Sequence, residues 1–271
     1  MKFHQPTTLA DALALKAELG AEAYFLAGGT DLVVLRNRGR VRGQHWIDLS
    51  RIRELIGFDE ERGTLRIGAA TPHARLEKSP YKALAEAAAS VGGPQIRQRG
   101  TVGGNVGNAS PAGDVSTALL AHNAEIELAS VRGDRRLNLD EFFVGPGKTV
   151  IAPDEIITAF HLQTDIRSAW FKVGKREATA ISVVAAAVGV DARDRAYIAL
   201  ASVAPRPVRI KAAEDLVAQR GLSAATAEEA GRLVSESITP ITDHRASAEY
   251  RRAIAGTMVT RMLTQLAQGD A

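Results

Sequence analysis

Two glycine-rich segments carry the strongest chemical signal in the sequence. Residues 27–31 read Ala-Gly-Gly-Thr-Asp and residues 101–105 read Thr-Val-Gly-Gly-Asn, and each follows an extended run and precedes a helical pattern. Glycine has no Cβ atom, so neighbouring backbone N–H groups can approach phosphate oxygens, and a helix N-terminus adds partial positive charge. The pair therefore suits a diphosphate. Either segment alone could be an ordinary turn, because glycine pairs are common in turns.

Standard nucleotide-binding motifs do not fit these glycines. The segment 103–107, Gly-Gly-Asn-Val-Gly, lacks the G-x-G-x-x-G spacing of a Rossmann turn. Residues 147–149 resemble the end of a P-loop, but Phe142 stands where that motif needs glycine.

Two arginines flank the second glycine-rich segment. Arg97 and Arg99 could contact phosphate, but we favour a structural role in which they clamp the loop through backbone carbonyls.

Other chemistries have little support, and we predict no catalytic side chain and no metal site. The six histidines include no H-x-x-x-H pair: His4, His45, His73, His122, His161 and His244. His73 could approach a cofactor, although a surface position is the simpler interpretation. Ser110 lacks the glycines of a nucleophile elbow. The sequence has no cysteine, so thiolate-bound zinc and iron–sulfur clusters would have to lie on another chain.

Composition indicates a globular protein. The residues are 45% hydrophobic and 24% charged, and a chain of 271 residues is long enough to predict two compact units. The net charge of +3 gives little support to nucleic-acid binding. The basic run at 36–42 is most simply a solvated loop, with a subunit or phosphate contact as the alternative. The longest apolar stretch, 181–190, is too short for a membrane span, which needs about 20 residues. With no secretory signal pattern, we expect a cytoplasmic protein without membrane insertion.

The elements that position these residues follow from periodicity and from breaker residues. A helix over 8–19 and a strand over 23–26 open a β-α-β unit, and Thr30 or Asp31 could cap the next short helix. Further on we predict a long loop without secondary structure over 95–114, between helices at 81–91 and 115–122. Expected strands lie at 45–48, 65–67, 125–131, 136–139 and 155–162. The C-terminal region should contain strands at 171–173, 181–190 and 197–203 and helices at 211–220, 224–238 and 246–266.

The order and spacing of these motifs resemble one family, the FAD-binding medium subunits of molybdenum hydroxylases. These proteins are related to the flavin domain of xanthine dehydrogenase and to the carbon monoxide dehydrogenase flavoprotein. The resemblance rests on residues 27–32, on Pro-Gln-Ile-Arg at 94–97 running into 100–105, and on Ala-Ser-Pro at 109–111 followed by Asp114. It covers essentially the whole chain, since residues 154–157 and 171–172 also fall where the family has a strand and a lysine.

The resemblance implies an α+β fold with two parts. A two-lobed FAD-binding domain would occupy residues 1–165, with a small αβ lobe over about 1–52 and a larger mixed α/β lobe over 53–165. The cofactor would extend between the lobes. A C-terminal flavoprotein domain over 166–271 would consist of a three-stranded antiparallel sheet with helices.

The resemblance also implies the cofactor-binding residues. The first turn would cradle the diphosphate, the second would form the opposite wall, and Asp114 would bind a sugar or ribityl hydroxyl, a role that suits a carboxylate acceptor. Ile157 would be apolar cover and Lys172 a hydrogen-bond donor on the flavin side. The full set is Leu26, Ala27, Gly28, Gly29, Thr30, Asp31, Leu32, Thr101, Gly104, Asn105, Asn108, Asp114, Ile157 and Lys172.

The implied function is electron transfer within an oxidoreductase complex, a heterotrimer or its dimer. A large partner subunit with the molybdenum cofactor would hydroxylate the substrate, and a small partner with two [2Fe–2S] clusters would pass electrons to the FAD of this chain. The acceptor could be NAD, a quinone or oxygen. Two alternatives remain. One is a stand-alone FAD-dependent oxidoreductase of related fold, and the other is a scaffold subunit that has lost its flavin.

Overall fold

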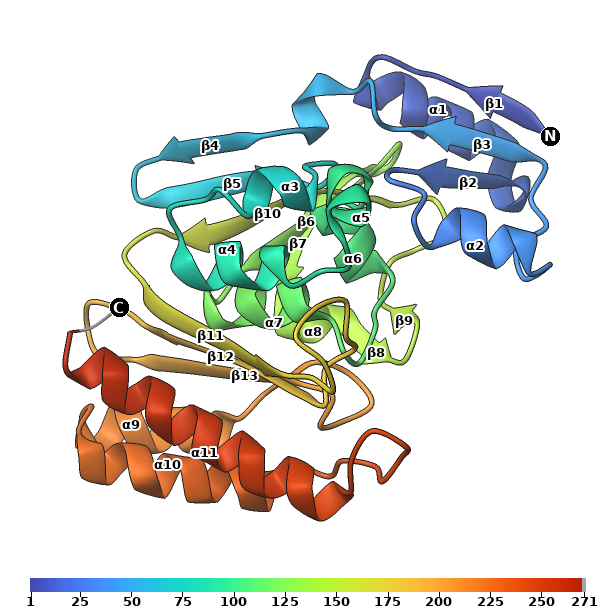
Figure 1. The fold of residues 1–271 in the computed structure, drawn as a ribbon. Coiled ribbons are helices and arrows are strands. Elements are labelled where there is room, and N and C mark those ends of the chain that lie inside the picture. The colour runs from blue at the N-terminus through green and yellow to red at the C-terminus, as the bar shows by residue number, and fades with distance from the viewer. Residues whose placement is uncertain (270–271) are drawn as a thin grey trace.

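The computed structural model describes residues 1–269, and its three larger sheets follow one another along the chain, with a small two-stranded sheet, β8-β9, in addition (Figure 1). The first sheet is parallel with strand order β1-β3-β2 and lies at one end of the molecule. Its lobe contains β1 (Lys2–His4), α1 (Leu9–Leu19), a 3₁₀ turn (Gly20–Glu22), β2 (Ala23–Leu26), α2 (Leu32–Asn37) and β3 (His45–Asp48).

Helix α1 shows how the sequence positions this lobe. The Thr8 hydroxyl accepts a hydrogen bond from Asp11 N at 3.2 Å, which caps the helix, and Ala12 and Leu13 are buried against the sheet. The Lys16 ammonium donates to the Ala23 carbonyl at 2.6 Å. This bond joins the helix to the start of β2, the strand that leads into the first glycine turn.

The second sheet has strand order β4-β5-β10-β6-β7 and is antiparallel. Its main core packs Ile126 and Phe160 of the sheet with Leu119 of α7. The lobe contains a 3₁₀ turn (Arg53–Leu55), β4 (Phe58–Glu61), β5 (Thr64–Gly68), α3 (His73–Leu76), α4 (Lys82–Ala89), α5 (Pro94–Arg99), α6 (Val102–Gly107), α7 (Asp114–Ala121), β6 (Glu125–Ser130), β7 (Gly133–Asn138), α8 (Leu139–Phe142), β8 (Phe143–Gly145), β9 (Lys148–Thr149) and β10 (Ile156–Gln163).

The prediction that 95–114 lacks secondary structure is wrong, because α5 and α6 lie within this segment. Pro94 occupies the first turn of α5, where its missing N–H has no intrahelical partner to lose, and Thr101 caps α6. Glycines disfavour a helix in isolation, but Val102, Gly103 and Val106 of α6 are buried, and buried backbone groups must be hydrogen-bonded.

The third sheet has strand order β11-β12-β13-β14 and packs α9, α10 and α11 on its outer face, while α4 and α7 cover the inner face (Figure 1). Gly189 permits close packing of α7, since a side-chain carbon there would lie 2.0 Å from the Ala121 carbonyl oxygen. The elements are β11 (Arg167–Val173), β12 (Val184–Val190), β13 (Ala196–Ala201), β14 (Val208–Arg209), α9 (Lys211–Arg220), α10 (Ala224–Ser237) and α11 (Ala248–Ala267).

The predicted α+β fold and the helices behind the C-terminal sheet are confirmed, but this sheet has four strands rather than three. The additional strand, β14, has only two residues, too few to show the alternation by which strands are recognised in a sequence. Among residues 1–269, none of the helices combines the length and apolar composition that crossing a bilayer requires.

Candidate functional site

The first glycine turn, residues 27–31, connects β2 to α2 at the edge of the N-terminal sheet. Gly29 has a φ of +75°, a backbone conformation that residues other than glycine rarely adopt. The backbone N–H groups of residues 28–32 donate no hydrogen bond to any part of the chain within residues 1–269. The turn therefore presents a row of unused donors, which an anionic ligand could occupy.

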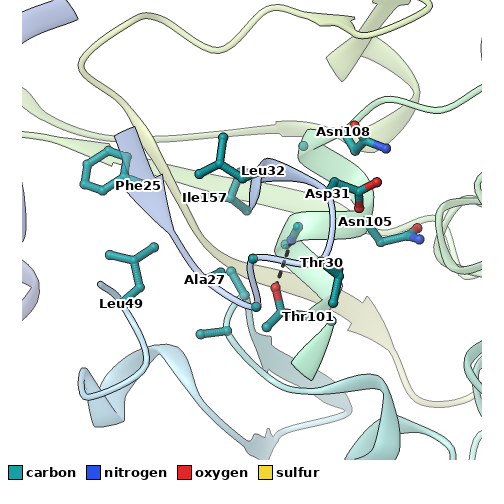
Figure 2. A pocket seen from close by; sticks show the side chains of 18 of the residues that line it. Phe25, Ala27, Thr30, Asp31, Leu32, Leu49, Thr101, Asn105, Asn108 and Ile157 are labelled. Carbon is teal, nitrogen blue, oxygen red and sulfur yellow. Dashed lines mark hydrogen bonds between the residues drawn. The ribbon is translucent and has the colours of Figure 1, made fainter. Parts of the chain in front are cut away.

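In the second glycine turn, residues 101–105, the N–H groups of residues 102–105 are occupied. Val102 N donates to the Thr71 carbonyl at 3.0 Å, and Gly103 N donates to the Ala69 carbonyl at 2.7 Å. Gly104 N donates to the Thr101 hydroxyl at 3.1 Å, the dashed bond in Figure 2. These bonds hold the turn against the segment after β5, so the second turn forms a fixed wall.

The two turns meet through Gly28. A side-chain carbon at Gly28 would lie 1.9 Å from the Arg99 carbonyl oxygen and 2.9 Å from the Gly100 Cα atom. Only a residue without a side chain allows this backbone-to-backbone contact. The first turn thus packs against the residues that lead directly into the second turn, and this close packing requires glycine at position 28.

Both turns line one cavity of about 360 Å³, here called the inter-turn cavity. It contains eleven of the predicted residues: Ala27, Gly28, Gly29, Thr30, Asp31, Leu32, Thr101, Gly104, Asn105, Asn108 and Ile157. Figure 2 shows its two characters: Phe25 and Leu49 lie on one side of the first turn, and Asp31, Asn105 and Asn108 lie on the other. The cavity thus offers an apolar half and a polar half, with free N–H groups between them.

Three predicted residues do not line this cavity. Leu26 lies at the end of β2, while Asp114 and Lys172 pair with each other. The Asp114 carboxylate accepts from Lys172 Nζ at 2.6 Å, from the Ser182 hydroxyl at 2.6 Å and from the Ser90 hydroxyl at 3.0 Å. This buried carboxylate thus has donors from three separate segments of the chain around it.

Lys172 lines a second cavity of about 770 Å³, here called the Lys172 cavity. Its walls include Ser90, Trp170, Arg97 and the segment 174–180 that connects β11 to β12. Ile157 lies in the inter-turn cavity, so these two residues do not share one cavity. The segment 89–93 separates the two spaces, because Val91 faces the inter-turn cavity while Ser90 and Gly92 face the other.

Residues 1–162 match the family described as the FAD binding domain in molybdopterin dehydrogenase, and residues 169–266 match the CO dehydrogenase flavoprotein C-terminal domain. This chain belongs to the family of FAD-binding subunits of molybdenum hydroxylases.

Relatives in this family match along nearly their full length. The xanthine dehydrogenase FAD-binding subunit of Escherichia coli O157:H7 is 34% identical over 97% of this chain and 94% of its own. The carbon monoxide dehydrogenase medium chain of Hydrogenophaga pseudoflava is 30% identical over 97% of this chain and 95% of its own. A chain of the Cu,Mo-CO dehydrogenase structure, in its cyanide-inactivated form, has a TM-score of 0.91 and 30% identity and covers 100% of this chain and 98% of that chain. As a member of this family, the chain is an oxidoreductase subunit with FAD as its cofactor.

The residues present fit FAD. A diphosphate needs hydrogen-bond donors, and the free N–H groups of residues 28–32 provide them. The apolar half of the cavity suits an adenine ring, which gains from contact with Phe25, Leu49 and Leu55. Among residues 1–269 there is no cluster of three or more side chains that could hold a metal ion.

Several cavity residues were not foreseen from the sequence. Phe25, Leu49 and Leu55 carry no motif, and a core position would explain each of them equally well. His73 is buried and lines the inter-turn cavity, so the expectation of a surface histidine is wrong. Burial, with a smaller contribution from the Arg97 guanidinium, lowers the pKa of His73 to about 4.

Arg97 confirms the predicted clamp. Its Nε donates to Glu77 Oε2 at 2.6 Å, and one terminal nitrogen donates to the Gly92 carbonyl at 3.1 Å. Arg99 is exposed, and its side chain makes no hydrogen bond or ion pair within the described residues 1–269. The clamp therefore belongs to Arg97 alone, and it fixes the segment that separates the two cavities.

Proposed function

We propose that this chain is the electron-transfer subunit of a molybdenum hydroxylase complex, which accepts electrons from [2Fe–2S] clusters of a small partner subunit. It then delivers them to an external acceptor such as NAD, a quinone or oxygen. Bound FAD supplies the redox chemistry, because its ring system can take up and release electrons. The residues of this chain bind and orient the cofactor.

The observation that carries the proposal is the row of free N–H groups at residues 28–32, which line a cavity shared with the second turn. In the proposal these groups hold the diphosphate, and the adenine lies on the apolar side beside Phe25 and Leu49. Asn105 and Asn108, on the polar side, are placed to hydrogen-bond sugar hydroxyls. Leu26 contributes its backbone at the start of the turn.

The flavin end of the cofactor is proposed to extend toward the Lys172 cavity. Lys172 lines this cavity and is paired with Asp114, and Ile157 in the inter-turn cavity is proposed as apolar cover for the flavin. Because Asp114 already accepts three hydrogen bonds from this chain, the proposed contact with a ribityl hydroxyl would replace or share one of them. The Lys172 ammonium keeps donor capacity beyond its bond to Asp114, which suits a flavin carbonyl.

Partner subunits complete the proposal. The sequence contains no cysteine, so the clusters that supply electrons are assigned to a small partner and the molybdenum cofactor to a large one. The relatives described as medium chains of carbon monoxide dehydrogenase support such an assembly. A domain boundary near residue 165 belongs to the same proposal, since it falls between the two family matches and between β10 and β11.

The test is to purify the chain with and without its proposed partners and to measure bound flavin after release. We expect about one FAD per chain, and reduction of that flavin by the complex when the hydroxylase substrate is added. A flavin-free chain that FAD cannot reconstitute would indicate a scaffold subunit. Substrate turnover by the isolated chain would indicate a stand-alone FAD oxidoreductase instead.

A further inference from the structure

His73 is a buried side chain without a partner at the inter-turn cavity. It begins α3 and is 2% exposed, and its Nδ1 atom is enclosed without a hydrogen-bond partner. Nε2 also has no partner among residues 1–269, although the structure does not enclose it. Buried polar groups are nearly always hydrogen-bonded, so an unpaired imidazole in a cavity wall points to a ligand.

The protonation state of His73 determines what the ring can offer. Its pKa is lowered to about 4, by burial first and then by Arg97, so the ring is neutral near pH 7 and carries one N–H. A buried N–H without an acceptor is the least tolerated arrangement, whereas a bare lone pair is accepted more often. The proton therefore lies on Nε2 and the enclosed Nδ1 has the lone pair, which makes His73 a donor toward the cavity.

The ring lies beside the junction of the two turns. A side-chain carbon at Gly100 would be 3.2 Å from His73 Cδ2, the ring atom next to Nε2, and 3.5 Å from the Thr30 hydroxyl oxygen. The backbone N–H of His73 donates to the Gly100 carbonyl at 2.9 Å, which fixes the residue in this position. The Cδ2 atom of the ring and the Thr30 hydroxyl therefore both lie close to Gly100, and His73 lines the same cavity as the first turn, whose own N–H groups are free.

We propose that His73 is a cofactor-binding residue whose neutral imidazole donates a hydrogen bond from Nε2 to a diphosphate oxygen of FAD. The inference rests on the proposed placement of the diphosphate at the first turn. His73 adds a side-chain donor to the backbone donors of residues 28–32. Together they surround the anion with hydrogen-bond donors, and the histidine contributes as a neutral ring rather than as a cation.

The test is the affinity of the full chain for FAD and for ADP after its own flavin has been removed. We expect His73→Leu to weaken both ligands by the same factor, about tenfold or more, because a hydrogen bond to a charged group is lost. His73→Gln retains a donor near the Nε2 position and should remain within about threefold of the wild type. The affinity for adenosine, which lacks phosphate, should be unchanged in both variants.

His122 provides the matched control. It is fully buried, its Nδ1 also lacks a partner and its pKa is also lowered to about 4, but Nε2 lies 3.0 Å from the Ser168 hydroxyl and the ring lines neither cavity. His122→Leu should therefore lower thermal stability while leaving the affinity of the folded protein for FAD and ADP unchanged.

Three outcomes would overturn the inference. These are unchanged FAD and ADP affinity in His73→Leu, an equal loss of adenosine affinity, or an equal loss of FAD affinity in His122→Leu. Circular dichroism and thermal unfolding establish that each variant is folded, and His73→Gln keeps the test valid if the leucine variant does not fold. If the wild-type chain bound neither FAD nor ADP, this result would instead contradict the proposed function, and the inference about His73 would fail with it.

Discussion

The two glycine turns look alike in the sequence but have different roles in the structure. The N–H groups of residues 28–32 are free, whereas those of residues 102–104 bond to Thr71, Ala69 and Thr101. The first turn therefore has donors for a ligand, and the second uses its donors to hold its own position. A glycine pair thus indicates that the backbone comes close to something, but it does not say whether that neighbour is a ligand or the protein itself.

Gly28 and Gly104 also differ in what surrounds them. Its missing side chain makes room for the Arg99 carbonyl, so it joins the two turns before any ligand binds. Gly104 faces the cavity from α6, and a side-chain carbon there would meet only the Thr101 hydroxyl, at 3.0 Å. Substitutions at the two glycines should therefore produce different kinds of damage, and the following predictions test this in order of decreasing effect.

Gly28→Val should separate the two turns. The added carbons cannot fit beside the Arg99 carbonyl, so we expect the free energy of unfolding of the flavin-free protein to fall by about 3 kcal/mol, with loss of FAD binding. Denaturant unfolding monitored by circular dichroism measures the first effect. Stability equal to wild type would contradict the close packing of Gly28 against the Arg99 carbonyl.

Gly104→Val should block the ligand and leave the fold intact. Valine is more favourable than glycine within a helix, and only the Thr101 hydroxyl must adjust, so stability should change little. FAD affinity should fall by about tenfold or more, because the branched side chain enters the cavity. Gly145→Ala is the control, since a side-chain carbon there meets nothing within 4 Å. If Gly104→Val bound stoichiometric FAD with unchanged affinity, the assignment of Gly104 to the FAD site would be wrong.

Arg97→Met tests the clamp on the segment 89–93, which separates the two cavities. Loss of the bonds to Glu77 and to the Gly92 carbonyl should lower the free energy of unfolding by about 2 kcal/mol. Arg99→Met, two residues away and without these partners, should have stability within about 0.5 kcal/mol of wild type. A double-mutant cycle with Glu77→Gln separates the ion pair from the carbonyl bonds. Equal effects at both arginines would contradict the clamp.

A pair of threonine variants gives the smallest and sharpest contrast. Thr101→Val removes the cap of α6 and should lower the free energy of unfolding by about 1 kcal/mol. Thr30→Val alters a hydroxyl that has no partner within residues 1–269, so it should leave stability unchanged and weaken FAD binding severalfold. If the two variants exchanged these effects, the roles assigned to the turns would be reversed.

Local patterns in the sequence predicted much of the fold. The helix expected over 8–19 is present as α1 with Thr8 as its cap, and the strands expected at 125–131 and 155–162 are present as β6 and β10, which pair with each other. The α5–α6 segment and β14 were missed, because short elements depend on burial and pairing more than on their own composition. The positions of the two glycine turns could also be predicted from the sequence, since few other residues can replace glycine at such turns.

What the sequence determined by itself was the family, the two glycine turns and the lack of any cysteine for a cluster on this chain. Only the tertiary structure decided that one turn has free donors, that Asp114 pairs with Lys172, and that His73 is buried at the cavity. The physical reason is range. Capping and turn formation depend on neighbours within a few residues, whereas the state of a donor, a carboxylate or an imidazole depends on atoms that come together only when distant segments pack.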